Sequence, residues 1–176
     1  MEHDWYPQPL PKNVSLGPGS WLHSSHAFEH FRSSRPNALV TGRSCGLYIG
    51  THFELGPNGR VSMGDYVNVT GAVFATNHDV QIGDHALISW SVVLADRFAP
   101  TPADVDFSPA TVGQSDGDIV VGDGCWIGMR AVLLGGARLG KRVIVGASAV
   151  VDFEVPDDCM VAGNPPRIRP ITPRRV

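Results

Sequence analysis

The chain has 176 residues and a formal net charge of −3, and this length is enough for one domain with its own core. The net negative charge gives no electrostatic footprint for nucleic acid, and no apolar run approaches the length of a membrane span. The acidic first ten residues lack the apolar core of a signal peptide, and three cysteines make no disulfide framework. We therefore expect a cytoplasmic protein that neither binds nucleic acid nor inserts into a membrane.

Residues 1–40 show no regular repeat and are predicted to form an N-terminal cap or extension. The stretch WLHSSHAFEHFRSS favours a short helix capped at Ser24 or Ser25. Its Ala27, Phe28 and Phe31 would pack on the repeats that follow, because the ends of a repeat domain require covering.

The same segment contains His23, His26 and His30, which would share one face of that helix. Histidines are common metal ligands, but no cysteine or carboxylate stands in clear register with these three. We interpret them as ordinary histidines of the cap and expect no metal.

Residues 41–166 carry a repeat of six. In a helix, such a period would spread the aliphatic residues over three faces, and a simple strand would also make position i+2 apolar. The chain must therefore turn within each unit, as in a parallel β-helix of hexapeptide repeats. Every sixth residue is aliphatic at Val121, Ile127, Leu133, Leu139, Val145 and Val151, and apolar residues follow four places later at Cys125, Ala131, Ala137, Val143, Ala149 and Val155.

The six-residue period also extends towards the N-terminus and is interrupted once. The break, residues 96–118, is rich in Pro, Asp and Ser, and a long irregular loop in a compact domain usually indicates function or disorder. We predict an all-β solenoid with this loop extruded between coils, followed by a basic tail at residues 167–176. The earlier repeat positions are Leu94, Ile88 and Ile82, then Ala75, Val69 and Met63 after one extra residue, with Ile49 and Leu55 as a looser start.

Three stretches resemble the hexapeptide-repeat acyltransferases, and more narrowly the maltose and galactoside O-acetyltransferases and their sugar-modifying relatives. These stretches are FELGPNGRVSMGDY, IGDHALISWSVVLAD and VVGDGCWIGMRAVLLGGARLGKRVIVGASAVVDFEVPDDCMVAGNPPRI. The resemblance covers about residues 53–167. It implies a left-handed β-helix, against the usual right-handed crossover, and a homotrimer with sites between subunits. It also implies acetyl-CoA as acyl donor and a loop histidine that deprotonates the acceptor hydroxyl.

The resemblance places the donor along the C-terminal coils. Trp126 matches an aromatic position that lines the cleft, with structural packing as the alternative. Ala147 matches a position whose backbone contacts the pantetheine arm. Met129 stands where relatives often have a small polar residue, and its backbone can still serve. Arg167 matches a basic residue that faces the CoA phosphates, although a solvated basic tail is an alternative for the four arginines of the C-terminus. Asp152 stands where relatives frequently have threonine.

The expected catalytic histidine is absent, because Ala99 stands in its place within RFAP. Eighteen residues, about one turn of three hexads, separate His78 from Asp96, so we expect these two residues to stack at the corner of the missing base. Histidine titrates near neutral pH, which makes His78 the candidate general base. Asn77 and Asp96 are the candidate substrate-binding residues beside it.

Several alternatives remain open. His78 is also interpretable as a surface histidine in a turn, and His85 as the base is a weaker possibility. The leading function is a CoA-dependent acyltransferase, most simply an acetyl-CoA-dependent O-acetyltransferase acting on a sugar or a similar small acceptor. The alternative is a non-catalytic trimer that binds CoA or sugar or serves as a scaffold. A zinc carbonic anhydrase on the same fold would need three zinc histidines, and His52, His78 and His85 lack that arrangement.

Overall fold

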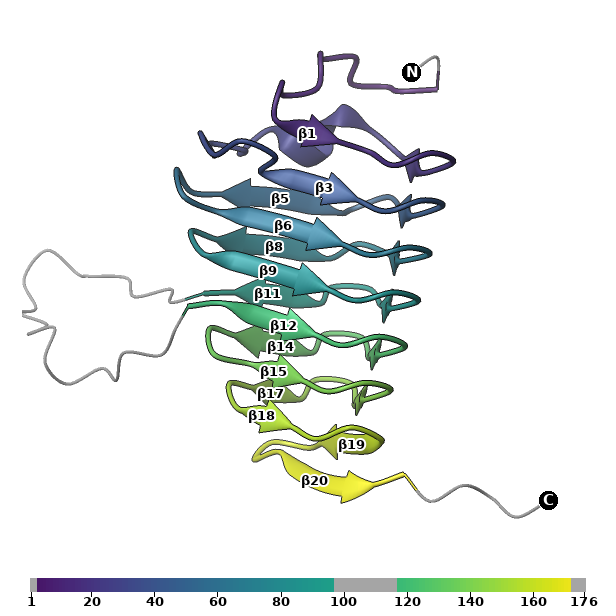
Figure 1. The fold of residues 1–176 in the computed structure, drawn as a ribbon, viewed down its shortest axis with the longest axis vertical. Helices are drawn as coiled ribbons and strands as arrows, with labels where there is room; N and C mark the ends of the chain where they lie inside the picture. Colours follow the sequence, from purple (N-terminus) through teal and green to yellow (C-terminus); the bar gives the residue numbers. More distant parts are fainter. Residues whose placement is uncertain (1–2, 97–116, 172–176) are drawn as a thin grey trace, which may run out of the picture.

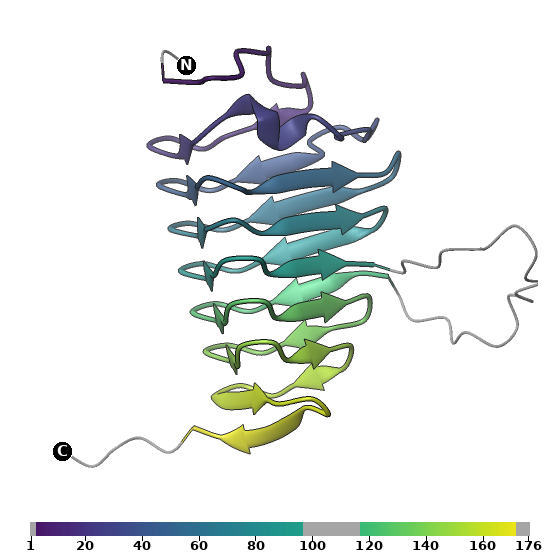
Figure 2. The ribbon, with the colours of Figure 1, turned by 180° about the vertical axis from the view of Figure 1, so that it is seen from behind.

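The computed structural model describes residues 3–96 and 117–171 and shows a left-handed parallel β-helix (Figure 1). The chain winds upon itself, so that each coil from β3 to β17 adds one strand to each of three sheets, as the reverse view also shows (Figure 2). The predicted all-β solenoid is confirmed. In the described part of the chain, no helix is long and apolar enough to cross a membrane.

Each sheet forms one side of the prism, and its strands come from successive coils. Sheet A contains β1 (Val14–Ser15), β3 (Leu39–Thr41), β6 (Arg60–Met63), β9 (Asp79–Ile82), β12 (Ile119–Val121), β15 (Arg138–Leu139) and β18 (Glu154–Val155). Sheet B contains β2 (Trp21–Leu22), β4 (Gly46–Leu47), β7 (Asn68–Val69), β10 (Leu87–Ile88), β13 (Trp126–Ile127), β16 (Ile144–Val145), β19 (Cys159–Ala162) and the antiparallel β20 (Arg167–Pro170). Sheet C contains β5 (His52–Leu55), β8 (Val73–Thr76), β11 (Val93–Ala95), β14 (Val132–Leu134) and β17 (Val150–Val151).

The core lies along the axis of the prism, where the repeat predicts it. All six aliphatic positions from Val121 to Val151 are at most 3% exposed, and so are the six apolar positions that follow them. Parallel register stacks the same position of successive coils, so that Leu94 pairs with Leu133 and Leu133 with Val151. Each coil therefore buries the apolar surface of the next, which is the main stabilising term of such a fold.

Two of the earlier repeat positions were predicted in the wrong register. Ala75 lies on the outer face of β8, and the adjacent Phe74 fills the core instead. The corner between β7 and β8 has one residue fewer than that between β10 and β11, which moves the inward position back by one. Ile49 is likewise 53% exposed at a corner, while Leu47 is buried.

The N-terminal segment supplies the first coil and closes the prism. A 3-10 helix, η1 (Ser25–Phe28), stands where the other coils have a strand of sheet C, and Ser24 caps it as predicted. Phe28 stacks on Phe53 with ring centroids 5.4 Å apart, and Phe53 stacks on Phe74 at 4.9 Å. These rings cover the end of the core, which is the role expected of a cap.

The corners between sheets A and B carry a ladder of carboxylates that joins neighbouring coils. Asp84 accepts the backbone N–H of Asp65 at 2.8 Å, and Asp123 accepts that of Asp84 at 3.1 Å. Asp123 also pairs with Lys141 at 3.0 Å. A hydrogen bond from Lys141 and another from the Asp84 backbone lower the pKa of Asp123, which favours its charged form.

Candidate functional site

His78 lies at the corner between sheets C and A, between β8 and β9, and is exposed. Its backbone N–H donates to Thr76 Oγ1 at 2.9 Å, and its carbonyl accepts from the backbone of Arg60 at 3.0 Å. The turn is thus fixed through its backbone, and the imidazole is left accessible to a ligand. Accessibility is the first requirement for a general base.

Asp96 is 9% exposed and lies under the same corner. Its carboxylate accepts from Thr76 Oγ1 at 2.9 Å and from the backbone N–H of Asn77. The predicted stacking of His78 on Asp96 is off by two residues, because Ala95 pairs with Ala75 and Asp96 therefore lies beside Thr76. Its carboxylate binds Thr76 and the backbone of the turn. Asp96 holds the turn that carries His78.

The neighbours of the His78 ring are engaged elsewhere. The Asn77 side chain accepts the backbone N–H of Asn58 at 2.9 Å, and Asp79 pairs with Arg35. The ring itself lies against Gly117, the first described residue after the loop. Ala99, where the resemblance expects a histidine, lies outside the described residues.

The residues assigned to the donor lie on a different edge of the prism. Trp126 projects from the outer face of sheet B, 50% exposed, and its indole N–H donates to Ser89 Oγ at 3.2 Å. Met129, 48% exposed, and the exposed Ala147 lie at successive corners between sheets B and C. The carbonyl of Met129 accepts the N–H of Ser148 at 2.9 Å, which ties the two corners together.

Trp90, which the sequence analysis did not single out, extends this edge towards the N-terminus. Gly71 leaves room for this indole because it has no side chain. A Cβ added at Gly71 would lie 2.3 Å from the ring. A Cβ added at Gly50, one coil earlier, would lie 3.6 Å from the same ring. Trp90 thus covers two corners and borders the position of Ser89 and Trp126.

Basic residues lie at the C-terminal end of sheet B. The strand register aligns Trp126 with Ile144, Ile144 with Met160 and Met160 with Arg169. Arg167 is exposed on the same final strand, β20. One row of side chains on the outer face therefore begins at the indole of Trp126 and ends at the positive charge of Arg169. This arrangement suits a long ligand with an anionic end.

Sheet C separates the His78 corner from the donor edge within one chain. Its outer face carries a column of valines, Val73, Val93, Val132 and Val150, in direct strand register. Beside it runs a column of Ala75, Ala95 and Leu134. By contrast, the outer face of sheet A carries mainly polar side chains, among them Ser62, Gln81, Arg138 and Glu154. The face of sheet C is therefore more apolar than that of sheet A, while the large exposed apolar side chains lie on sheet B, among them Trp21, Leu87 and Met160.

Metal ligation finds no support in the described residues. Within residues 3–96 and 117–171, no group of three or more His, Cys, Asp or Glu side chains is placed to hold a metal ion. This includes His23, His26 and His30 of the N-terminal segment, and His52, His78 and His85.

Comparison with known proteins gives the following relatives. Residues 118–152 match the bacterial transferase hexapeptide (six repeats) family. The chain is 27% identical over 122 residues to the galactoside O-acetyltransferase of Escherichia coli K12, covering 66% of this chain and 56% of that protein. It is 24% identical over 110 residues to the enzyme of the same name from Lactococcus lactis, covering 62% and 51%. The chain thus spans about half the length of these curated relatives.

Solved structures lead to the same group. A hexapeptide-repeat-containing acetyltransferase of Vibrio cholerae is 28% identical with a TM-score of 0.56, covering 76% of this chain and 70% of that one. A structure of such a protein from the same species complexed with acetyl coenzyme A is 25% identical with a TM-score of 0.59, covering 90% and 72%. An N-acyltransferase of Bacillus cereus shares the fold at 17% identity, with a TM-score of 0.66 and coverage of 93% and 86%. These matches show that the chain has the hexapeptide-repeat fold and is similar to acetyltransferases of this fold.

Proposed function

We propose that the protein is an acetyl-CoA-dependent acyltransferase that acts on a hydroxyl of a sugar or a similar small acceptor. The observation that carries this proposal is the exposed edge formed by Trp126, Met129 and Ala147. It lies within the segment that matches the transferase hexapeptide family, and a similar solved structure contains acetyl coenzyme A. The residues fit such a donor, because exposed apolar side chains and open backbone corners lead to Arg169 and Arg167.

In this proposal His78 is the general base. Bound acetyl-CoA supplies a thioester, which a hydroxyl attacks poorly until a base takes its proton. The imidazole accepts that proton as the acceptor oxygen bonds to the acetyl carbon, and returns it to the sulfur when the carbon–sulfur bond breaks. Asp96 and Thr76 position the turn, and Asn77 and Asp96 are the acceptor-side residues of the proposal.

Self-association through sheet C brings the donor edge and the His78 corner close together. The face that bears Val73, Val93 and Val132 lies between the two edges, so packing it around a threefold axis brings the donor edge of one subunit to the His78 corner of the next. A homotrimer built this way buries the apolar columns and assembles the site at the same time. Trp126 and His78 would then act from different subunits.

The test is a thiol-release assay with acetyl-CoA and a panel of glycosides. Wild-type protein should release CoA only when an acceptor is present, and His78→Ala should lower turnover by roughly 10²–10⁴-fold, the range for loss of a general base. His85→Ala, another exposed-corner histidine, is the matched control and should retain activity. Equal activity of His78→Ala and wild type would eliminate His78 as the base.

The alternative function, a non-catalytic trimer that binds CoA or sugar, is favoured by one observation, which is Ala99 in place of the expected histidine. Calorimetry with acetyl-CoA, combined with the thiol-release assay, separates the two functions. Micromolar acetyl-CoA binding together with acceptor-dependent CoA release supports the enzyme, while binding without release by any glycoside that binds the protein supports the alternative.

A further inference from the structure

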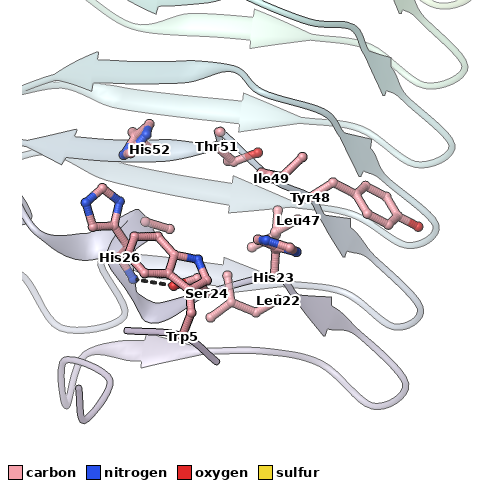
Figure 3. Close-up of a pocket in the computed structure, with 12 residues that line it drawn as sticks. Trp5, Leu22, His23, Ser24, His26, Leu47, Tyr48, Ile49, Thr51 and His52 are labelled. Carbon is pink, nitrogen blue, oxygen red and sulfur yellow. Dashed lines mark hydrogen bonds between the residues drawn. The ribbon is translucent and has the colours of Figure 1, made fainter. Parts of the chain in front are cut away.

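A cavity of about 180 Å³ lies in the N-terminal cap, outside the site described above. It opens between the first two coils, where β2 leads into η1 and β4 leads into β5 (Figure 3). We call it the cap pocket. Its described lining residues are Trp5, Leu22, His23, Ser24, His26, Ala27, Leu47, Tyr48, Ile49, Gly50, Thr51 and His52.

The indole of Trp5 borders the cap pocket and is held there by its neighbours in sequence. Asp4 accepts from Ser24 Oγ at 2.6 Å and from the Ser25 backbone at 2.8 Å, and Gln8 N–H donates to Ser25 Oγ at 3.1 Å. Desolvation opposes ionisation of Asp4, but these hydrogen bonds lower its pKa overall. Hydrogen bonds thus hold the chain on both sides of Trp5, and its indole is 64% exposed. The indole also packs beside His26, with ring centroids 5.1 Å apart, so it is held at the border of the pocket with most of its surface open to a ligand.

The polar groups of the cap pocket match neutral hydroxyls. Among the described lining residues none is Lys, Arg, Asp or Glu, so the pocket offers no fixed charge to an anion or a cation. Its imidazoles, His23 and His52, and the phenol of Tyr48 each both donate and accept hydrogen bonds, as sugar hydroxyls do. Leu22 and Leu47 provide an apolar floor on which a ring can rest. A small pocket that combines an aromatic wall, an apolar floor and neutral polar groups suits one pyranose ring.

The cap pocket lies on the same edge of the prism as the proposed donor edge, nearer the N-terminus. Gly50 lines the pocket, and Trp90 lies against Gly50 and Gly71. Trp90 follows Ser89, which accepts from Trp126. Two coils separate the pocket from Ser89, a distance of about 10 Å at the strand spacing of a sheet. A ligand that occupies both places must therefore extend beyond a single ring.

We propose that the cap pocket binds a neutral sugar ring of the acceptor, remote from the hydroxyl that is acylated, so that the acceptor is a glycoside of more than one ring. This inference rests on the proposed acyltransferase function for the identity of the ligand as acceptor. The binding itself does not depend on it.

The binding test uses tryptophan fluorescence and calorimetry with methyl glucopyranoside, methyl galactopyranoside and maltose, in the absence of CoA. Trp5→Ala should weaken binding of the best glycoside about tenfold, as expected for loss of an aromatic contact. Tyr66→Ala is the matched control, because Tyr66 is an exposed aromatic residue of another corner that does not line the pocket. Absence of binding by the wild type up to roughly 50 mM, far above millimolar affinity, would overturn the proposal. Equal weakening in both variants would do the same.

The transfer test separates this proposal from the enzyme function. Wild type should have a higher kcat/KM for maltose than for methyl glucopyranoside, mainly through KM, and Trp5→Ala should abolish that preference while sparing CoA binding. Transfer that is indifferent to Trp5 contradicts the acceptor subsite but leaves the acyltransferase intact. Trp5-dependent glycoside binding without any transfer supports the sugar site and contradicts the acyltransferase.

Discussion

The imidazole of His78 occupies the space that a side chain at Gly117 would need. A Cβ built on Gly117 would lie 2.4 Å from Cδ2 of the ring, which is shorter than any ordinary contact. Because the obstacle is the end of a flexible side chain, the ring can swing aside at small cost to stability. Gly117→Ala should therefore lower turnover and leave the midpoint of thermal unfolding and the affinity for acetyl-CoA nearly unchanged.

The control for this prediction is a double-mutant cycle with His78→Ala. If Gly117→Ala acts by displacing the ring, it has no further effect once the ring is gone. Additive losses of turnover in the double variant would show that Gly117 affects catalysis by another route.

Thr76→Val tests whether Asp96 stabilises the turn. Thr76 is 3% exposed, and its hydroxyl donates to the Asp96 carboxylate at 2.9 Å and accepts the N–H of His78 at 2.9 Å. Losing a buried bond to a charged acceptor should cost about 1–3 kcal/mol in the free energy of unfolding, measured by chemical denaturation. Thr51→Val is the matched control, because Thr51 is equally buried but makes a longer bond, 3.4 Å, to a neutral carbonyl. The idea fails if the control loses as much stability.

Trp126→Ala should weaken acetyl-CoA binding about tenfold in calorimetry, because it removes the exposed indole of the donor edge. Ser89→Ala should have a smaller effect, since it removes the acceptor at 3.2 Å that orients the indole but keeps the ring. Trp21→Ala, on the same sheet face several coils away, serves as the control and should bind acetyl-CoA like wild type. Undiminished binding by Trp126→Ala would remove this residue from the donor site.

The Asp123–Lys141 pair predicts a pH dependence of stability. The lowered pKa of Asp123 in the folded protein, below its ordinary value of 3.8, means that folding favours its ionised form. This contribution is fully present above pH 3.8 and is lost as the pH falls through the lowered folded value. Asp123→Asn should have a lower melting temperature than wild type at neutral pH. At acidic pH the two melting temperatures should lie closer together. High salt should shrink the difference at neutral pH, because the pair is exposed and screened.

The sequence predicts the coil and its core well, because the inward position recurs every six residues wherever the corners keep the same length. It misplaces Ala75, because the corner before β8 is one residue shorter than that before β11. It misplaces Ile49, because Leu55 is the second inward residue of β5, and the first, Phe53, is six residues after the buried Leu47. The handedness of the helix came from the resemblance, since period alone is the same for either hand. Sequence spacing brings the His78 turn near Asp96 but misplaces the contact by two residues, because Val73 pairs with Val93, 20 residues on rather than 18.

The assembly of the site was less accessible to sequence reasoning. The valines of sheet C directly precede core aliphatics, so they are difficult to distinguish from core residues until the strands are placed. Trp90 owes its position to a residue missing at Gly71 one coil earlier. The cap pocket needs Trp5 and His52, which lie far apart in sequence and border the same cavity only once the N-terminal segment is placed beside the second coil.

Val132→Glu tests whether sheet C is the face of self-association. The side chain lies in the middle of the valine column, between Val93 and Val150, so a trimer would bury the new carboxylate against apolar neighbours. Burying an unpaired charge is strongly unfavourable, and we expect light scattering to show a monomer. Val120→Glu is the matched control, because Val120 is a half-buried outward valine of the same coil on sheet A. It should keep the mass of the wild type.

A folded Val132→Glu variant that keeps both the trimer mass and acceptor-dependent CoA release would refute assembly through sheet C. A monomer that has lost this release supports a site shared between subunits, because within one chain sheet C keeps His78 and Trp126 on separate edges.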